Sequence, residues 1–241
     1  MTVIGKYPFQ LSPQDCDFRE QVSLPALGDL ILQAAGKSAD ENGFGMQKLN
    51  TENRTWVVSR MAIEMQRFPK WREWINIETW VEEVGRAATT RNFRITDENN
   101  KVIGGASTLW AMIDVATRKA IDLKTVEGLS NAASQIPAII EKPGRVTSVD
   151  GIAVKSHCVT YSDIDFNHHA NSMKYVEWLL DCFSIDWHKK HFVKRFEINF
   201  LHEVLYGHEV DIFHKQEEML SLFEIKKDDG SGVCRMKLEW Q

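Results

Sequence analysis

The spacing of apolar and polar residues in the first half of the chain predicts one helix followed by four strands. Between residues 24 and 37 polar side chains recur every four positions, so most of the helix surface is apolar and needs a covering partner. Ser23 can cap this helix, and Pro25 suits its first turn, where an N–H is not needed. Four runs rich in β-branched and aromatic residues follow and supply the partner. They span residues 55–68, 73–84, 89–96 and 102–115.

The second half repeats this order, with a predicted strand at 152–161, a helix at 171–187 and four more strands. Those strands span residues 193–204, 209–216, 219–226 and 232–240. Between the halves, residues 126–150 lose the regular pattern and contain glycines and prolines, which indicates a linker. A central helix wrapped by an antiparallel sheet is the hot-dog arrangement. We therefore predict an α+β protein with a tandem (double) hot-dog fold, comprising a first domain at 1–125, a linker at 126–150 and a second domain at 151–241.

A short motif is repeated ahead of both predicted helices. Asp15-Cys16-Asp17-Phe18 lies 148 positions (163 minus 15) before Asp163-Ile164-Asp165-Phe166. At the same offset, Asn167 corresponds to Arg19 and His169 corresponds to Gln21. The two aspartates and the phenylalanine occur in both copies, whereas the asparagine and the histidine occur only in the second. We therefore expect the second half to carry the chemistry and the first half to serve another task.

The second copy sets an acid, an amide and an imidazole at alternate positions before a helix. In an extended segment Asp165, Asn167 and His169 share one side of the chain. The helix that follows aims unpaired backbone N–H groups at whatever these side chains hold, and those near Ala170 are candidates for an oxyanion hole. The pattern indicates an acid–base active site, whereas the same motif alone is more often loop and capping chemistry.

Composition narrows the class of protein. The 241 residues are 43% hydrophobic, which is enough for well-covered cores, and the net charge of −5 argues against a general nucleic-acid binder. Four widely spaced cysteines without a Cys-x-x-Cys pair favour a reducing cytosol. The sequence shows neither a signal peptide nor a membrane span of about 20 apolar residues, so we expect a cytoplasmic protein.

No cofactor or metal is expected from the sequence. The pairs His168-His169 and His188 with His191 lack the i, i+4 histidine spacing with an intervening glutamate that marks a zinc helix. Cys182 on the second helix is expected to be a small core residue. The tryptophans, including Trp110 and Trp178, are expected to line the core.

Several segments together resemble the acyl-acyl carrier protein (acyl-ACP) thioesterase family. In the first half these are Trp56-Val57-Val58-Ser59-Arg60-Met61, Arg67-Phe68-Pro69-Lys70-Trp71, Glu78-Thr79-Trp80-Val81 and Ser107-Thr108-Leu109-Trp110-Ala111-Met112. In the second half Asp165-Phe166-Asn167-His168-His169-Ala170-Asn171 resembles the family's Asp-x-Asn-x-His-x-Asn signature, continued by Lys174-Tyr175. The resemblance implies a tandem hot-dog with one active site, in the second half.

The resemblance also implies a fourth catalytic residue. Plant members have a glutamate followed by a cysteine on the strand facing the signature, and Glu203-Val204 stands there in this chain. A cysteine nucleophile is therefore not expected. In one assignment Glu203, assisted by Asp165, activates water while Asn167 and His169 position the thioester. In the other, His169 is the base and a carboxylate orients it.

The function implied is hydrolysis of fatty acyl-ACP to free fatty acid and ACP during fatty acid biosynthesis. The expected partner is the acyl carrier protein with its fatty acyl-phosphopantetheine, and a homodimer is compatible with the sequence. An acyl-coenzyme A thioesterase is the competing interpretation, because the hot-dog fold hosts both activities. A non-catalytic acyl-binding module is the third, although it would not need the polar residues kept in the second half.

Two further groups of residues carry predictions. The first half is expected to hold the apolar acyl tail between its helix and one strand. The lining residues are Leu27, Leu30, Ile31, Ala34, Val58 and Met61. A basic cluster after the second helix is expected either to dock the acidic carrier or to be a solvated turn. Its members are Lys189, Lys190, Lys194 and Arg195.

Overall fold

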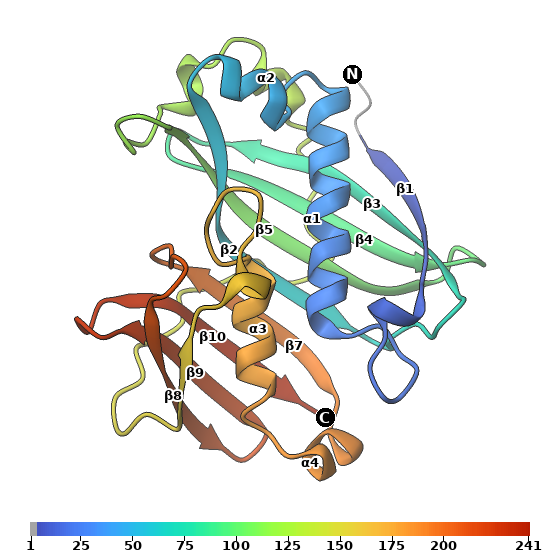
Figure 1. The fold of residues 1–241 in the computed structure, drawn as a ribbon. Coiled ribbons are helices and arrows are strands. Elements are labelled where there is room, and N and C mark those ends of the chain that lie inside the picture. Colours follow the sequence, from blue (N-terminus) through green and yellow to red (C-terminus); the bar gives the residue numbers. More distant parts are fainter. Residues whose placement is uncertain (1–3) are drawn as a thin grey trace. The chain divides into compact units, whose positions relative to one another are not determined.

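The computed structural model describes residues 4–241, and the chain divides into two compact units, Met1–Pro143 and Gly144–Gln241. The first three residues of the predicted first domain lie outside the described part. In each unit a helix lies against one face of an antiparallel sheet (Figure 1). The tandem hot-dog fold predicted from the sequence is confirmed.

The sheet of the first unit has the strand order β1, β3, β4, β5, β2, with every neighbouring pair antiparallel. Its strands are β1 (Gly5–Gln10), β2 (Arg54–Met65), β3 (Trp74–Val84), β4 (Thr89–Asp97) and β5 (Val102–Asp114). The four predicted strands correspond to β2 to β5. The sequence pattern missed β1, a short edge strand with only one neighbour and with both a glycine and a proline, residues that strands usually avoid.

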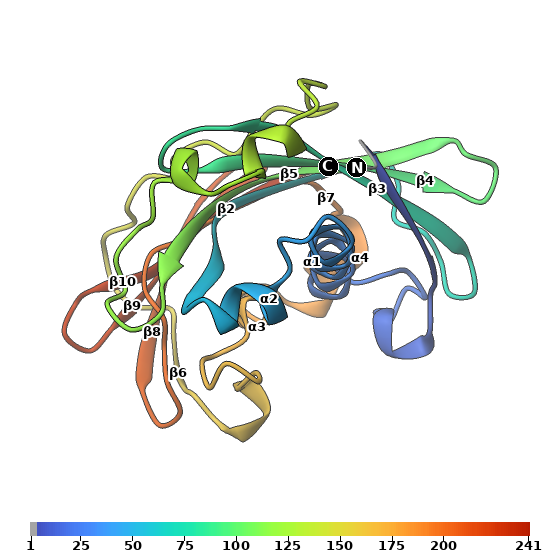
Figure 2. The ribbon, with the colours of Figure 1, turned by 90° about the horizontal axis from the view of Figure 1, so that it is seen from above.

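Helix α1 (Leu24–Glu41) lies in the concave side of this sheet (Figure 2). Its start follows the sequence prediction, because the Ser23 hydroxyl accepts a hydrogen bond from the Ala26 N–H at 3.3 Å and Pro25 occupies the first turn. The helix continues one turn beyond the predicted end at Lys37. Leu27, Ile31 and Ala34 are fully buried, as the nearly continuous apolar surface required.

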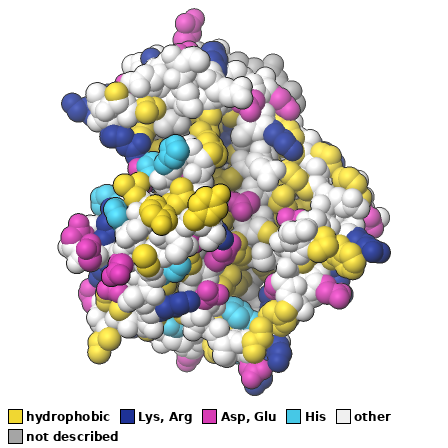
Figure 3. Space-filling model, in the orientation of Figure 1, with side chains coloured by type: hydrophobic (Ala, Val, Ile, Leu, Met, Phe, Trp, Pro, Cys, Tyr) yellow, Lys and Arg dark blue, Asp and Glu magenta, His cyan; other side chains and the backbone are white. Residues whose placement is uncertain are grey.

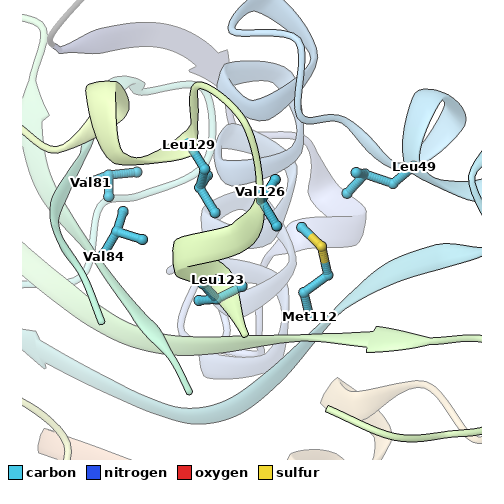
Figure 4. Close-up of a cluster of buried hydrophobic side chains, with 7 residues drawn as sticks. All are labelled: Leu49, Val81, Val84, Met112, Leu123, Val126 and Leu129. Carbon is cyan, nitrogen blue, oxygen red and sulfur yellow. The ribbon is translucent and has the colours of Figure 1, made fainter. Parts of the chain in front are cut away.

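A second cluster of apolar side chains closes one end of the first unit (Figure 4). Helix α2 (Met46–Thr51), β3, β5 and residues 123–129 contribute to it. Its buried members are Leu49, Val81, Val84, Met112, Leu123, Val126 and Leu129. The segment that begins at 126 is therefore packed on the first unit at its start, whereas the sequence predicted a linker from that position.

The sheet of the second unit has the order β7, β10, β9, β8, β6, again antiparallel. Its strands are β6 (Lys155–Cys158), β7 (Val193–Phe200), β8 (Glu209–Glu217), β9 (Leu220–Lys227) and β10 (Gly232–Trp240). Helix α3 (Ser172–Leu180) crosses one face, where the Tyr175 ring lies 6.5 Å from that of Phe200 and the Trp178 ring lies 4.2 Å from that of His157. Glu177, a polar residue of this helix, is exposed.

The helix predicted at 171–187 is broken in two, and this prediction was wrong in its length. After α3 the chain turns, and α4 (Ile185–Lys190) starts at Ser184, whose hydroxyl accepts a hydrogen bond from the Trp187 N–H at 3.2 Å. The turn directs Phe183 into an aromatic cluster, with its ring 4.9 Å from Trp240 and 5.7 Å from Phe223. The aromatic contacts of this ring and the serine cap together favour the break over a continuous helix.

A strap formed by residues 144–149 crosses the second sheet on its polar side. The N–H of Gly144 donates to Glu197 at 2.7 Å, that of Val146 donates to the Asn199 side chain at 2.9 Å, and that of Val149 donates to Glu224 at 2.8 Å. All three acceptors are buried. Burial alone would raise the pKa of Glu197 and Glu224, but these N–H groups and neighbouring cations outweigh it and hold both pKa values below the ordinary range.

Candidate active site

The polar motif of the second unit forms a tight loop ahead of α3. The Asp165 N–H donates to the His169 carbonyl at 2.9 Å, and the His168 N–H donates to the Asp165 carbonyl at 3.0 Å. His168 has a positive φ of 66°, which reverses the chain. The Asn171 side chain then caps α3 by accepting from the Met173 N–H at 2.7 Å. The loop thus delivers its side chains directly to the helix start.

The loop ahead of α1 has the same geometry. The Asp17 N–H donates to the Gln21 carbonyl at 2.8 Å, the Glu20 N–H donates to the Asp17 carbonyl at 3.0 Å, and Glu20 has a φ of 59°. Each of these residues lies 148 positions before its counterpart in the second unit. The internal repeat seen in the sequence is therefore a repeat of backbone structure.

A second segment lies beside each loop and extends the correspondence. The Ala170 N–H donates to the Val204 carbonyl at 2.8 Å, and the Val22 N–H donates to the Pro69 carbonyl at 2.9 Å. Pro69 therefore corresponds to Val204. The residue before each of them is Phe68 in the first unit and Glu203 in the second.

His169 and Glu203 meet in the second unit. The Nε2 atom of His169 lies 3.2 Å from a carboxylate oxygen of Glu203, and both side chains are partly exposed, at 29% and 42%. Glu203 belongs to the segment after β7, which ends at Phe200, and not to the strand predicted to reach residue 204. An imidazole held by a carboxylate and open to solvent can take a proton from water.

Asp165 and Asn167 form a second pair within the loop. One oxygen of the Asp165 carboxylate accepts the Asn167 N–H at 2.8 Å, and the other accepts the Asn167 side-chain amide at 3.3 Å. The amide has a second N–H, and Asn167 is exposed. In the first unit Arg19 takes this place, with Nε 2.9 Å from Asp17. Asp165 therefore fixes the direction of the Asn167 amide.

The backbone groups proposed for an oxyanion hole are used within the protein. The Ala170 N–H is bound to Val204, and the Asn171 N–H donates to the Asp163 carbonyl at 2.8 Å. The expectation that N–H groups near Ala170 stabilise the oxyanion was therefore wrong for these two. The Asn167 side-chain amide, two residues before His169, is another donor of this loop.

Asp163 is a supporting residue to which the sequence analysis gave no role. One of its carboxylate oxygens accepts the Thr160 N–H at 2.7 Å, the Thr160 hydroxyl at 2.9 Å and a His157 nitrogen at 3.1 Å. Burial works to raise the pKa of Asp163, but these hydrogen bonds hold it below its usual value. The spacing Thr160-x-x-Asp163, matched by Ser12-x-x-Asp15, was a capping-box signal in the sequence.

The residues predicted to line an acyl pocket lie in the first unit. Five of the six are buried, namely Leu27, Leu30, Ile31, Ala34 and Met61. Val58 is half-buried on β2, where it is paired with Trp110 of β5. Their role as tail-binding residues stays a prediction.

The basic cluster is only partly a surface. Lys189, Lys190 and Lys194 are exposed, and Lys189 lies 3.1 Å from Asp186. Arg195 is buried, and its Nε lies 3.0 Å from Glu197. Arg195 was therefore wrongly included among the docking residues, because it serves a buried ion pair in β7.

None of the four cysteines forms a disulfide, and none belongs to the loop or to the Glu203 segment. Cys234 is buried, and burial raises the pKa of its thiol. Cys182 lies just beyond α3 and donates to the Trp178 carbonyl at 3.4 Å. Among residues 4–241 no three histidine, cysteine or acidic side chains are arranged to hold a metal ion. In the same range, every helix is too short or too polar to span a bilayer.

Comparison with known proteins agrees with the fold. A solved acyl-ACP thioesterase from Bacteroides thetaiotaomicron VPI-5482 is 37% identical, with a TM-score of 0.93 over 99% of this chain and 98% of that chain. The 12:0-ACP thioesterase from Umbellularia californica has the same fold, with a TM-score of 0.86 at 19% identity over 100% of this chain and 98% of that one.

Curated relatives include the chloroplastic palmitoyl-acyl carrier protein thioesterase of Gossypium hirsutum, which is 23% identical over 83% of this chain and 53% of its own length. The chain spans about half the length of the curated relatives it matches. The family descriptions "Acyl-ACP thioesterase N-terminal domain" and "Acyl-ACP thioesterase C-terminal domain" match residues 5–126 and 147–241. Matched in both halves, the chain belongs to the acyl-ACP thioesterase family.

Proposed function

We propose that the chain hydrolyses fatty acyl-ACP to free fatty acid and ACP, and so ends acyl-chain synthesis. The observation that carries this proposal is the His169–Glu203 pair, 3.2 Å apart beside the oriented Asn167 amide, in a chain of this family. The first unit has Gln21 and Phe68 at the matching positions, so only the second unit can perform acid–base chemistry there.

In the proposed reaction water is the nucleophile. His169 takes a proton as the water oxygen bonds to the thioester carbon, and Glu203 stabilises the imidazolium that forms. The free N–H of the Asn167 amide donates to the carbonyl oxygen as it gains negative charge. The C–S bond then breaks, the imidazolium returns the proton to the leaving thiolate, and the fatty acid is released.

The role of Asp165 in this scheme is to position Asn167. Both of its oxygens accept hydrogen bonds from that residue, which fixes the direction of the amide. The 3.2 Å contact favours the assignment in which histidine is the base and a carboxylate orients it.

We propose that the acyl tail binds in the first unit, against the side chains named for it in the sequence. Each methylene buried there contributes about 0.8 kcal/mol, or about fourfold in binding, so a pocket of fixed depth selects chain length. The exposed lysines Lys189, Lys190 and Lys194 are the proposed docking site for the acidic carrier. Four unpaired cysteines suit the reducing cytoplasm, where we place the reaction, and light scattering would test for a homodimer.

The direct test is release of free fatty acid by the purified chain from acyl-ACP and acyl-coenzyme A substrates of matched acyl length. We expect faster release from acyl-ACP, with a preference that weakens as salt is added, because exposed charges are screened beyond about 10 Å at 0.1 M ionic strength. Equal rates on both substrates at low salt would favour the coenzyme A activity. No release from any thioester would refute the proposed reaction.

A further inference from the structure

Three uncharged, exposed side chains flank the catalytic pair, and we call them the aromatic rim. They are Phe166, which is 78% exposed, Leu205 at 43% and Tyr206 at 70%. Large apolar side chains at this exposure lose contact with water when a ligand covers them, which favours binding. In the space-filling view, hydrophobic side chains and histidines gather at the surface over the loop that precedes α3 (Figure 3).

The rim is held beside the reacting atoms by the contacts of the site. Phe166 follows Asp165 in the loop, and Leu205 and Tyr206 follow Glu203 in the neighbouring segment. The Ala170–Val204 hydrogen bond of 2.8 Å joins these two segments, and the His169–Glu203 contact of 3.2 Å joins them again. The rim residues therefore belong to the same two joined segments that carry His169 and Glu203.

The first unit has aromatic residues at the matching positions, but each of them lies next to an arginine. Phe18 corresponds to Phe166, and Trp71 corresponds to Tyr206 through the Pro69–Val204 equivalence. The Arg19 guanidinium lies 5.5 Å from the centre of the Phe18 ring, and that of Arg72 lies 4.1 Å from the Trp71 ring. Each of these aromatic rings thus lies against a cation of the protein itself.

In the second unit the cations are replaced by uncharged residues. Asn167 stands in place of Arg19, and Gly207 stands in place of Arg72. Gly207 and Arg72 both have a positive φ, of 80° and 69°, which supports their correspondence. Leu205 replaces Lys70. Three positive charges are thus absent from these positions in the second unit, and the aromatic rings there are the more exposed ones.

We propose that the aromatic rim binds the pantetheine arm of the substrate. This arm is uncharged and carries two amides, a hydroxyl and a geminal dimethyl group, which suit contact with aromatic faces and an aliphatic side chain. Arginines at the same places would instead suit a phosphate. The inference rests on the proposed thioesterase function, and it assigns the rim to the part of the substrate that ACP and coenzyme A share.

The test compares three thioesters of one fatty acid, made with ACP, coenzyme A and N-acetylcysteamine, a short thiol that lacks most of the arm. For the double variant Phe166→Ser/Tyr206→Ser, we expect kcat/KM to fall by about tenfold or more on the ACP and coenzyme A thioesters, mainly because KM rises. On the N-acetylcysteamine thioester we expect a change within about twofold. The matched control, Phe18→Ser with Trp71→Ser, should leave all three unchanged.

Three outcomes would overturn the inference. They are equal losses on all three thioesters, a loss confined to ACP, and no loss on any. Phe166→Gln alone, at the most exposed position of the rim, provides the same comparison if the double variant melts at a lower temperature. If the unaltered chain hydrolyses none of the three thioesters, the proposed function itself has failed, which is a different result from an insensitive rim.

Discussion

The loops ahead of α1 and α3 share their backbone hydrogen bonds but differ in most of their side chains. In each loop a carboxylate accepts a hydrogen bond from the hydroxyl three residues before it, Asp15 from Ser12 and Asp163 from Thr160. Each loop also contains a residue of positive φ, Glu20 or His168. At the position of His169 the first loop has Gln21, whose buried side-chain oxygen has no hydrogen-bond partner. The two units therefore share the scaffold, whereas the chemistry that we propose depends on residues 167, 169 and 203 of the second unit.

The sharpest way to break this comparison is to give the second loop the residue of the first. His169→Gln should lower kcat/KM by at least about a hundredfold, because it removes the only titratable nitrogen from the pair with Glu203. Fatty acid release and a thermal melt measure activity and folding together. The reciprocal variant Gln21→His should change neither. A folded His169→Gln protein with near-normal rates would contradict the assignment of the base.

A second substitution tests the proposed role of the first unit in binding the acyl tail. Ala34→Phe enlarges a fully buried side chain of α1 and should shift preference toward shorter acyl chains, with the rate on the best substrate staying within about tenfold. A competition assay over a mixture of acyl lengths measures the shift. If Val176→Phe in α3 moves the chain-length profile and Ala34→Phe does not, the tail binds outside the first unit.

Acid should weaken the second unit through its buried carboxylates. The pKa values of Asp163, Glu197 and Glu224 are depressed in the folded protein, so their stabilisation is present above the unfolded pKa values of about 4 and is lost as pH falls below them. Denaturant unfolding from pH 7 to pH 3 measures this loss. The Asp163→Asn variant should have a lower free energy of unfolding at pH 7, and this free energy should fall less steeply with decreasing pH than in the unaltered chain. An unchanged pH dependence would contradict the effect assigned to Asp163.

The shared capping box predicts a smaller effect that is equal in both loops. Thr160→Ala and Ser12→Ala each remove a hydroxyl bound to the capping carboxylate, at a cost of about 1 kcal/mol. Urea unfolding of each variant measures the cost. Only Thr160→Ala should also reduce activity, because only its loop carries the site. Equal losses of activity would mean that the two loops are not divided as we describe.

The smallest expected effect is that of removing the thiols. Replacing Cys16, Cys158, Cys182 and Cys234 with serine or alanine should keep kcat within about twofold, since general acid–base chemistry needs no thiol. Burial raises the pKa of Cys182 and Cys234, so both are neutral thiols near pH 7. Fatty acid release by the cysteine-free chain is the measurement. If the cysteine-free variant is folded but inactive, a cysteine takes part in the reaction and the proposed mechanism is wrong.

The sequence predicted the elements whose pattern is strong and missed those whose pattern is weak. The apolar surface of α1 and the β-branched runs of β2 to β5 are strong signals in the sequence. By contrast, β1 has one neighbouring strand and α2 has only six residues, too few for a clear pattern. The repeat located Asp165, Asn167 and His169. It could not show that Asp165 binds Asn167, that Glu203 lies beyond the strand, or that Arg195 is buried, because each depends on tertiary contacts.

The strap over the second sheet sets where the chain can be divided. A fragment that starts at residue 151, the domain boundary expected from the sequence, lacks the N–H groups that bind Glu197, Asn199 and Glu224. Two carboxylates and an amide would then be left without these partners on an opened surface. A fragment from Gly144 keeps all three, so limited proteolysis within residues 144–149 should be slow. The shortest second unit that folds should begin at Gly144 or earlier.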